Sequence, residues 1–306
     1  MSPTRHIITA MKLSPTVGWA AALVLVSISG LAPLAQQGPP PPRLPGRVQA
    51  GVTLLPNGWT IAPVGRHATI GDLPLAQVLS PDGRYAIVTN NGYAKPSLTI
   101  YDLQNQYVKG RVPLDHAWLG LTWHPDGQRL YSAGAAQNTV QELIWNNARL
   151  TKDKVIKIAE PDPTDHSKNG FVGGLAITPD GTTLFALQVF AKTLTAIDTT
   201  SRALKKTITL EAEPYTAMVA PDGKTLFVSS WGGAKILLFN PATLEKIGEV
   251  AVGEHPNAML LSKDNTRLFV ACANTNAVWV VDLKTKELST LEIRGVKPVV
   301  LKDDTK

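Results

Sequence analysis

Pro81-Asp82-Gly83 is the first of four identical tripeptides in this chain of 306 residues. The other copies are Pro125-Asp126-Gly127, Pro179-Asp180-Gly181 and Pro221-Asp222-Gly223, and a degenerate copy follows at Lys263-Asp264-Asn265. Successive aspartates are 44, 54, 42 and 42 residues apart. A repeat of about forty residues is typical of one propeller blade. The spacing therefore predicts a repeat protein.

Each copy contains four short apolar runs. In the first copy they span residues 75–79, 85–89, 98–101 and 108–114, and the Asp-Gly pair lies between the first two. Runs of this length, rich in branched and aromatic residues, indicate strands, and Asp-Gly favours a tight hairpin turn. No segment after residue 50 has a helical period. We therefore predict an all-β fold, a β-propeller of four-stranded antiparallel blades with five clear repeats plus N-terminal strands.

Several second strands resemble the Tyr-Val-Thr-Asn motif of the YVTN family of β-propellers. They are Ile87-Val88-Thr89-Asn90 and, more loosely, Phe269-Val270-Ala271 followed by Cys272-Ala273-Asn274. The stretch from Leu54 through Gly71-Asp72-Leu73-Pro74 to Tyr93 is more specifically similar to the N-terminal propeller half of bacterial propeller/alkaline-phosphatase-superfamily fusion proteins. The resemblance covers about residues 51–293 and implies a seven-bladed ring. It also implies that the phosphatase domain would lie beyond residue 306.

The sequence alone does not determine the number of blades. Five copies fill about residues 74–293, and one or two further strands are expected before them, at Val52–Leu55 and Trp59–Ala62. An incomplete seven-bladed propeller is the expectation, and a closed six-bladed ring is the alternative. Because an open ring exposes apolar blade faces, an incomplete propeller is expected to self-associate.

The N-terminal 50 residues differ in composition from the repeats. Arg5 and Lys12 precede an uncharged apolar stretch at residues 19–34, so residues 1–35 are predicted to be a signal peptide or N-terminal anchor. Residues 36–50 are a Pro-rich linker, and residues 51–306 form the YVTN-type propeller. The protein is therefore expected to be exported, to the periplasm or outside the cell. A membrane would be contacted only through an uncleaved N-terminal segment.

Composition excludes several functional classes. The net charge is +6, and the sequence contains no run of basic residues, so a nucleic-acid partner is not predicted. Cys272 is the single cysteine, which rules out a disulfide framework. No nucleophile elbow, phosphate loop or zinc-binding helix motif occurs in residues 1–306, so no catalytic residue and no cofactor are predicted.

Candidate binding residues follow from the topology of a blade. The loop after the second strand and the connection into the next blade share one face, opposite the Asp-Gly turns, and variable loops on a rigid scaffold often carry function. Aromatic rings, amides and imidazoles gather on this face and predict a ligand or protein site at the channel mouth; the alternative is that they cap strand ends. They are Asn91, Tyr93, His116, Trp118, Tyr215, Trp231, His255, Asn257 and Asn274.

The 54-residue spacing reveals an insertion between Ile158 and Phe171. Asp162, Asp165 and His166 in this segment could coordinate a divalent cation. Asp and Pro are also the ordinary residues of loops, and we interpret the insertion as a surface loop, so no metal site is predicted.

Three functional classes remain. The preferred one is an exported, non-catalytic propeller that binds an unknown protein or small molecule, as the propeller part of a phosphatase-linked protein without its catalytic domain. The first alternative is a hydrolase of lactonase type with a channel-mouth metal, for which the sequence offers His116, Glu213, Glu254 and His255. The second is a polyanion or cell-wall binder that would use Lys95, Lys192 and Lys235 with Phe190 and Trp231.

Overall fold

The computed structural model describes residues 44–62, 68–165, 169–275, 277–285 and 287–292, and every regular element among them is a strand. None of these residues forms a helix that could cross a membrane. The predicted signal peptide or anchor lies outside the described residues. The chain divides into two compact units, residues 1–65 and 66–306.

The first unit contains one small antiparallel sheet of three strands. Its strands are β1 (Gly46–Gln49), β2 (Val52–Leu54) and β3 (Thr60–Ile61), in the order β1-β2-β3. β2 and β3 lie at the two positions where one or two strands were expected from the sequence. β1 is an additional strand within the segment interpreted as a linker, and it pairs with β2 through Arg47 and Thr53.

The second unit consists of five four-stranded antiparallel sheets, here called blades 1 to 5. Blade 1 comprises β4 (Pro74–Leu79), β5 (Tyr85–Asn90), β6 (Ser97–Asp102) and β7 (Tyr107–Pro113). Blade 2 comprises β8 (Leu121–Trp123), β9 (Arg129–Ala133), β10 (Thr139–Asn146) and β11 (Arg149–Lys157). Blade 3 comprises β12 (Val172–Ile177), β13 (Thr183–Gln188), β14 (Thr193–Asp198) and β15 (Leu204–Thr209). Blade 4 comprises β16 (Pro214–Val219), β17 (Leu226–Ser230), β18 (Lys235–Phe239) and β19 (Lys246–Ala251). Blade 5 comprises β20 (Pro256–Leu261), β21 (Arg267–Cys272), β22 (Ala277–Asp282) and β23 (Leu288–Glu292).

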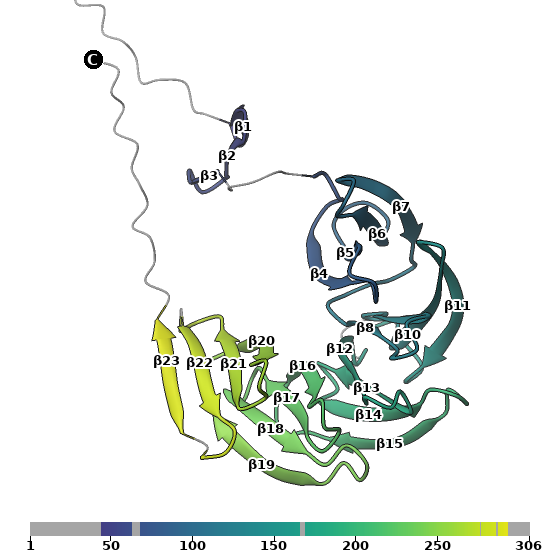
Figure 1. Ribbon diagram of the computed structural model, residues 1–306, viewed down its shortest axis with the longest axis vertical. Helices are drawn as coiled ribbons and strands as arrows, with labels where there is room; N and C mark the ends of the chain where they lie inside the picture. The colour runs from purple at the N-terminus through teal and green to yellow at the C-terminus, as the bar shows by residue number, and fades with distance from the viewer. Residues whose placement is uncertain (1–43, 63–67, 166–168, 276, 286, 293–306) are drawn as a thin grey trace, which may run out of the picture. The chain divides into compact units, whose positions relative to one another are not determined.

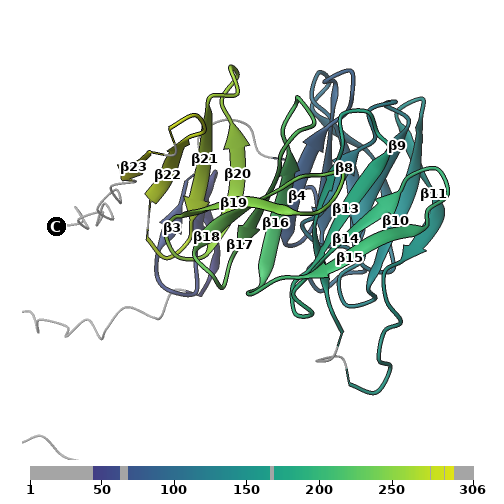
Figure 2. The same ribbon diagram turned by 90° about the horizontal axis from the view of Figure 1, so that it is seen from below.

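In every blade the four strands pair in chain order. Figure 1 shows the five sheets of this unit following one another side by side, from β4–β7 to β20–β23, and Figure 2 shows the same sheets from a second direction. The first strands of successive blades are neighbours. The all-β propeller architecture predicted from the repeat is confirmed. Whether the ring has six or seven blades stays a prediction.

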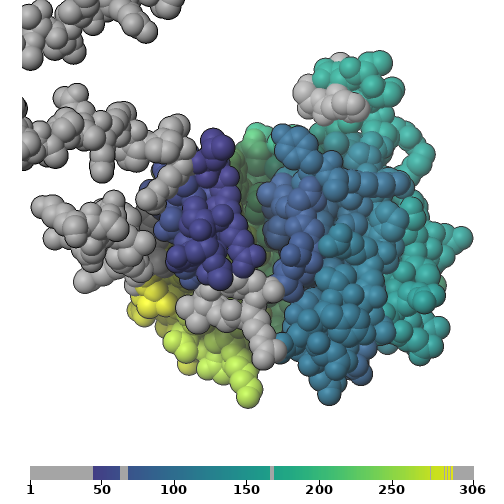
Figure 3. Space-filling view, turned by 90° about the horizontal axis from the view of Figure 1, so that it is seen from above, coloured from purple at the N-terminus to yellow at the C-terminus, as the bar shows by residue number. Residues whose placement is uncertain are grey.

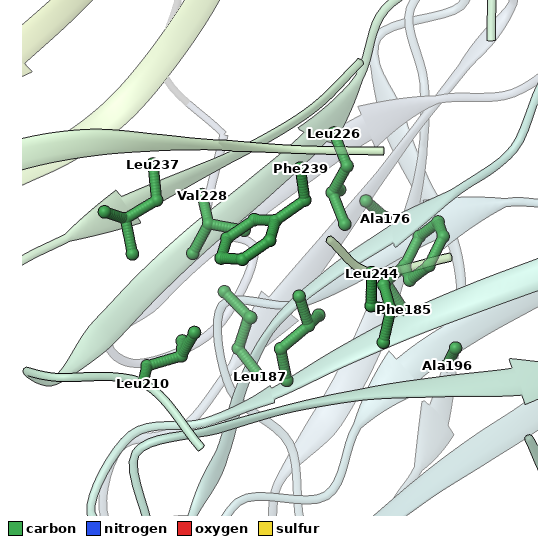
Figure 4. Packing of buried hydrophobic residues seen from close by; sticks show 11 residues of the cluster. Ala176, Phe185, Leu187, Ala196, Leu210, Leu226, Val228, Leu237, Phe239 and Leu244 are labelled. Atoms are coloured by element: carbon green, nitrogen blue, oxygen red, sulfur yellow. The ribbon is translucent and has the colours of Figure 1, made fainter. Parts of the chain in front are cut away.

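The hydrophobic core lies between successive blades. Between blades 3 and 4, Phe185 and Leu187 of β13 pack with Val228 of β17 and Phe239 of β18, all of them buried (Figure 4). All six residues of β13 are buried, because a blade is covered on both faces by its neighbours. This two-sided burial explains why the second strands are nearly continuous apolar runs.

The Asp-Gly turns are structural. Gly83, Gly127, Gly181 and Gly223 have φ angles of 69° to 75°, the left-handed conformation that glycine adopts without steric cost. In blade 1 the Ser80 hydroxyl donates to Asp82 and accepts a hydrogen bond from the Tyr85 N–H at 2.9 Å. That hydroxyl is the main reason that the pKa of Asp82 lies below its usual range. The turn is thus closed by its own side chains.

Blades 2 and 3 are also joined by a buried ion pair. Glu142 of β10 has no exposed side-chain surface, and its carboxylate accepts hydrogen bonds from Nε and Nη2 of Arg202 at 2.8 and 3.0 Å. Arg202 lies in the turn between β14 and β15 and is also 3.7 Å from Asp153 of β11. The hydrogen bond to Glu142 raises the pKa of Arg202.

Candidate ligand-binding rim

The loops opposite the Asp-Gly turns form what we call the variable rim: the loops after the second strands and the connections that enter each blade. Its first feature is a row of three aromatic rings between blades 2 and 3. Trp118 and Phe171 meet edge to face with ring centroids 5.1 Å apart, and Phe171 contacts Phe190 at 5.3 Å. Phe190 is 59% exposed. The row therefore presents an apolar aromatic surface to solvent.

Backbone and amide hydrogen bonds fix this row. The Phe171 N–H donates to Oδ1 of Asn138 at 3.0 Å, and the Phe190 N–H donates to the carbonyl oxygen of Gly170 at 2.9 Å. Oδ1 of Asn138 also accepts from Nε2 of Gln188 at 3.2 Å. Phe171 has a φ of 60°, a conformation that costs a non-glycine residue roughly 1–2 kcal/mol. The ring is held in place by contacts from two blades.

A second aromatic pair lies between blades 4 and 5. The centroids of Trp231 and His255 are 3.9 Å apart, and Trp231 is 37% exposed. His255, like Phe171, has a positive φ, of 52°. The Trp231 N–H donates to the carbonyl oxygen of Glu213 at 2.7 Å, which fixes the loop carrying Trp231 against the connection that enters blade 4.

An ion pair connects the two aromatic groups along the rim. Nζ of Lys192 is 2.9 Å from Oε1 of Glu213, and this contact is the main reason that the pKa of Glu213 is lowered. Lys192 lies two residues after Phe190, and the backbone of Glu213 holds Trp231. A Cβ atom at Gly232 would collide with the Glu213 carboxylate, so a larger residue here would displace the Glu213 side chain from its present position.

Two buried polar atoms at the start of blade 5 lack a hydrogen-bond partner among the described residues: Nδ1 of His255, whose ring lies against Trp231, and Oδ1 of Asn257. The backbone of Asn257 is fixed, because its carbonyl oxygen accepts a hydrogen bond from the Thr216 hydroxyl of blade 4. Tyr215, next to Thr216, is half-buried, and burial raises its pKa. His255, Asn257 and Tyr215 are all among the residues that the sequence assigned to the rim.

The remaining predicted rim residues are placed differently. With its amide nitrogen turned toward them, Asn91 donates to the carbonyl oxygens of Ala117 (2.9 Å) and Asn90 (3.2 Å), so it joins blade 1 to the entry of blade 2. Tyr93 and Asn274 are exposed, and His116 is half-buried. Among the described residues no ring contact joins Trp118 to Trp231. The predicted residues therefore form separate groups along the rim instead of one cluster.

The insertion between β11 and β12 projects beyond the ends of the strands (Figure 2), and its described part stands out from the surface in Figure 3. Oδ1 of Asp162 accepts hydrogen bonds from the N–H groups of Thr164 and Asp165 at 2.9 and 3.0 Å. Oδ1 of Asn169 accepts from the Asp162 N–H. His166 lies outside the described residues. No group of three metal-ligating side chains occurs among the residues that the structure describes.

Phe171 was not among the rim residues predicted from the sequence. Phe171 precedes Asp180 by nine residues, the spacing that separates His255 from Asp264. An alignment of the repeats would have placed the two rings at one position. The contact with Trp118 could not be found in this way, because it joins positions that differ between the copies.

No protein-family model and no curated protein matches the chain. The YVTN assignment therefore stays a prediction. Similar solved structures do exist. One is a protein from Bacteroides uniformis provisionally described as a 6-phosphogluconolactonase, with 17% identity, coverage of 78% of this chain and 75% of that one, and a TM-score of 0.60.

A virginiamycin B lyase from Staphylococcus aureus is similar at 15% identity over 72% of this chain and 70% of that chain, with a TM-score of 0.58. A functionally unknown protein from Desulfotomaculum acetoxidans is similar at 16% identity over 79% and 81% of the two chains, with a TM-score of 0.59. Likeness at this level of identity shows the fold, and the fold of this chain is a β-propeller.

Proposed function

We propose that this chain is an exported binding propeller whose variable rim holds a protein or small-molecule ligand by aromatic stacking. The observation that carries the proposal is the pair of fixed, partly exposed aromatic groups joined by the Lys192–Glu213 ion pair. Rigid rings with a few fixed polar groups are the usual composition of a binding site. The proposed role is that of a scaffold related to the propeller half of phosphatase fusion proteins.

The strained backbone at two aromatic positions supports a binding role. Phe171 and His255 occupy the same position of the repeat with φ angles of 60° and 52°. Leu73, nine residues before Asp82, shares this conformation at 47°, so three of the five repeats have the same bend. Glycine would adopt it without strain. The chain instead carries rings at two of these positions, and the ring of His255 lies against the partly exposed Trp231.

A catalytic alternative is favoured by two of the similar structures, whose descriptions are those of a lactonase and a lyase. Its proposed metal ligands do not converge among the described residues: Glu213 is paired with Lys192, and His255 lies against Trp231. Elemental analysis of the purified chain distinguishes the two classes. One bound divalent ion per chain would favour the hydrolase.

The polyanion-binding alternative depends on three lysines that each contact a carboxylate within the chain. The distances are 3.5 Å for Lys95–Asp115, 2.9 Å for Lys192–Glu213 and 3.1 Å for Lys235–Glu249. Each positive charge is locally neutralised, which argues against a polyanion site built from these residues. Heparin binding that weakens steeply with salt would reinstate this alternative.

The binding proposal is tested with Trp231→Ala and, as a matched control, Tyr107→Ala, which removes a comparably exposed ring from β7, away from the rim. The readout is the NMR spectrum of the full chain during titration with a fragment library that includes sugars, aromatic acids and prolyl peptides. We expect the fragments that bind to shift the rim signals of Phe190 and His255. Trp231→Ala should abolish these shifts with a nearly unchanged Tm, and Tyr107→Ala should preserve them.

Two outcomes contradict the proposal. One is the absence of fragment-induced shifts on the variable rim. The other is a large fall in Tm for Trp231→Ala, which would identify Trp231 as a packing residue. Export is tested separately by cell fractionation: recovery of an unprocessed chain in the cytosol would contradict it.

A further inference from the structure

The repeats carry a hydroxyl at one position of the Asp-Gly turn, two residues before the aspartate. In blades 1, 3 and 5 the hydroxyls of Ser80, Thr178 and Ser262 donate to the turn aspartate. Each also accepts the N–H of the residue five positions later, at 2.9, 3.1 and 3.0 Å. One hydroxyl therefore satisfies two groups in each of these turns.

Blade 2 replaces the hydroxyl with an imidazole. Nδ1 of His124 is 2.9 Å from the Asp126 carboxylate, and the N–H of Arg129 donates to Asp126 instead. Blade 4 has Ala220 at this position, and Ala220 can neither donate nor accept through its side chain. Among the described residues, the Asp222 carboxylate accepts only from the Lys224 N–H at 3.0 Å, and the Thr225 N–H has no acceptor.

A cavity lies at this same place, between blades 4 and 5. Its volume is about 350 Å³, and Ala220, Asp222 and Thr225 are part of its lining. The other walls are mainly apolar, and they include Phe227 and Leu238 of blade 4 and Leu261 of blade 5. A volume in this range suits a small molecule, and apolar walls with a few polar groups are typical of ligand sites.

We propose that this cavity binds a small apolar alcohol, whose hydroxyl occupies the place that a Ser or Thr hydroxyl holds in the turns of blades 1, 3 and 5. The ligand hydroxyl donates to Asp222 and accepts from the Thr225 N–H, and its apolar body lies against Phe227, Leu238 and Leu261. A hydroxyl fits this site because it is donor and acceptor at once. The site is on the Asp-Gly side and does not depend on the variable rim.

The test is an NMR titration of the full chain with benzyl alcohol, with toluene as the matched ligand that lacks only the hydroxyl. We expect shifts of the amide signals of Gly223, Thr225 and Asn265 and a Kd on the order of 1 mM. Two hydrogen bonds of about 1 kcal/mol each predict that benzyl alcohol binds roughly tenfold or more tightly than toluene.

Ala220→Ser supplies the hydroxyl from the chain itself. We expect this variant to fold at least as stably as the original chain and to bind benzyl alcohol roughly tenfold more weakly. Ala220→Gly is the control, because it adds no hydroxyl and should retain binding. Any of four results would overturn the proposal: no binding of benzyl alcohol, equal binding of toluene, unchanged binding by Ala220→Ser, or tighter binding of benzylamine, whose ammonium cannot accept from Thr225.

Discussion

Removing the hydroxyl of Ser80 and adding one at Ala220 should change stability in opposite directions. Ser80 is only 3% exposed, and its hydroxyl serves both Asp82 and the Tyr85 N–H. Ser80→Ala leaves that N–H without its partner, while Asp82 keeps the Arg84 N–H at 3.1 Å. A buried donor left unsatisfied costs about 1–3 kcal/mol. We expect a loss of about 1–2 kcal/mol, because water still reaches the turn.

Ala220→Ser adds a hydroxyl where the Asp222 carboxylate and the Thr225 N–H are both placed to receive it. The net contribution of an intramolecular hydrogen bond is about 0.5–1.5 kcal/mol, and fixing the new side chain offsets part of it. We expect a gain of about 0.5–1 kcal/mol. Urea denaturation followed by circular dichroism measures both changes, and Tm should shift by about 2–4 °C per kcal/mol.

The dependence of stability on pH in the acidic range gives a second measurement of the effect of Ser80→Ala. Hydrogen bonding to Ser80 lowers the pKa of Asp82 below its ordinary value of 3.8. A carboxyl with a depressed folded-state pKa contributes stability above its unfolded-state pKa and loses it as the pH falls through the folded-state pKa. The difference between the original chain and Ser80→Ala should therefore shrink below about pH 4. The assignment of these hydroxyls would be refuted if both substitutions changed stability with the same sign.

Arg202→Ala should destabilise the chain by about 2–4 kcal/mol in urea, because it leaves the Glu142 carboxylate buried without its two donors. Arg202→Lys should recover part of that loss, and a cost below about 1 kcal/mol would show that the pair is dispensable. Leu79 of β4 and Leu260 of β20 are 58% and 67% exposed, so light scattering should detect self-association. A cooperative monomer would instead favour closure of a six-bladed ring by the strands at residues 52–62.

The sequence contains most of the information about the fold. Successive Asp-Gly turns set the repeat, and the strands of blade 1 begin and end within one or two residues of the expected positions. β1 could not be expected, because Gly46–Gln49 follows a Pro-rich segment and has no apolar alternation. A strand is predicted from the alternation of its side chains, whereas β1 is a strand because its backbone pairs with β2.

The candidate site was predictable only in part. Trp231 and His255 were both assigned to the rim, and the structure brings their rings together. The contact of Trp118 with Phe171 and the pairing of Lys192 with Glu213 join different blades, so they depend on the angle between blades, which no single repeat encodes. The same reason explains why Asn91 is an interblade hydrogen-bond donor although its position suggested a ligand contact.

The repeat offers a way to find functional departures that does not depend on similarity to other proteins. Every blade must bury the same faces and close the same turns, so five copies of one position experience nearly the same backbone, and a deviating residue is compared with four internal controls. At the turn position, three hydroxyls donate to the turn aspartate and the His124 imidazole contacts its aspartate, whereas the side chain of Ala220 can do neither, and a cavity lies beside Ala220. The loops of the variable rim differ from blade to blade, so no such comparison between repeats can be made there. Binding at the rim must be inferred from the exposure and contacts of its side chains. Loss of benzyl alcohol binding in Ala220→Ser with retained fragment binding at Trp231 would therefore establish two independent sites on one propeller.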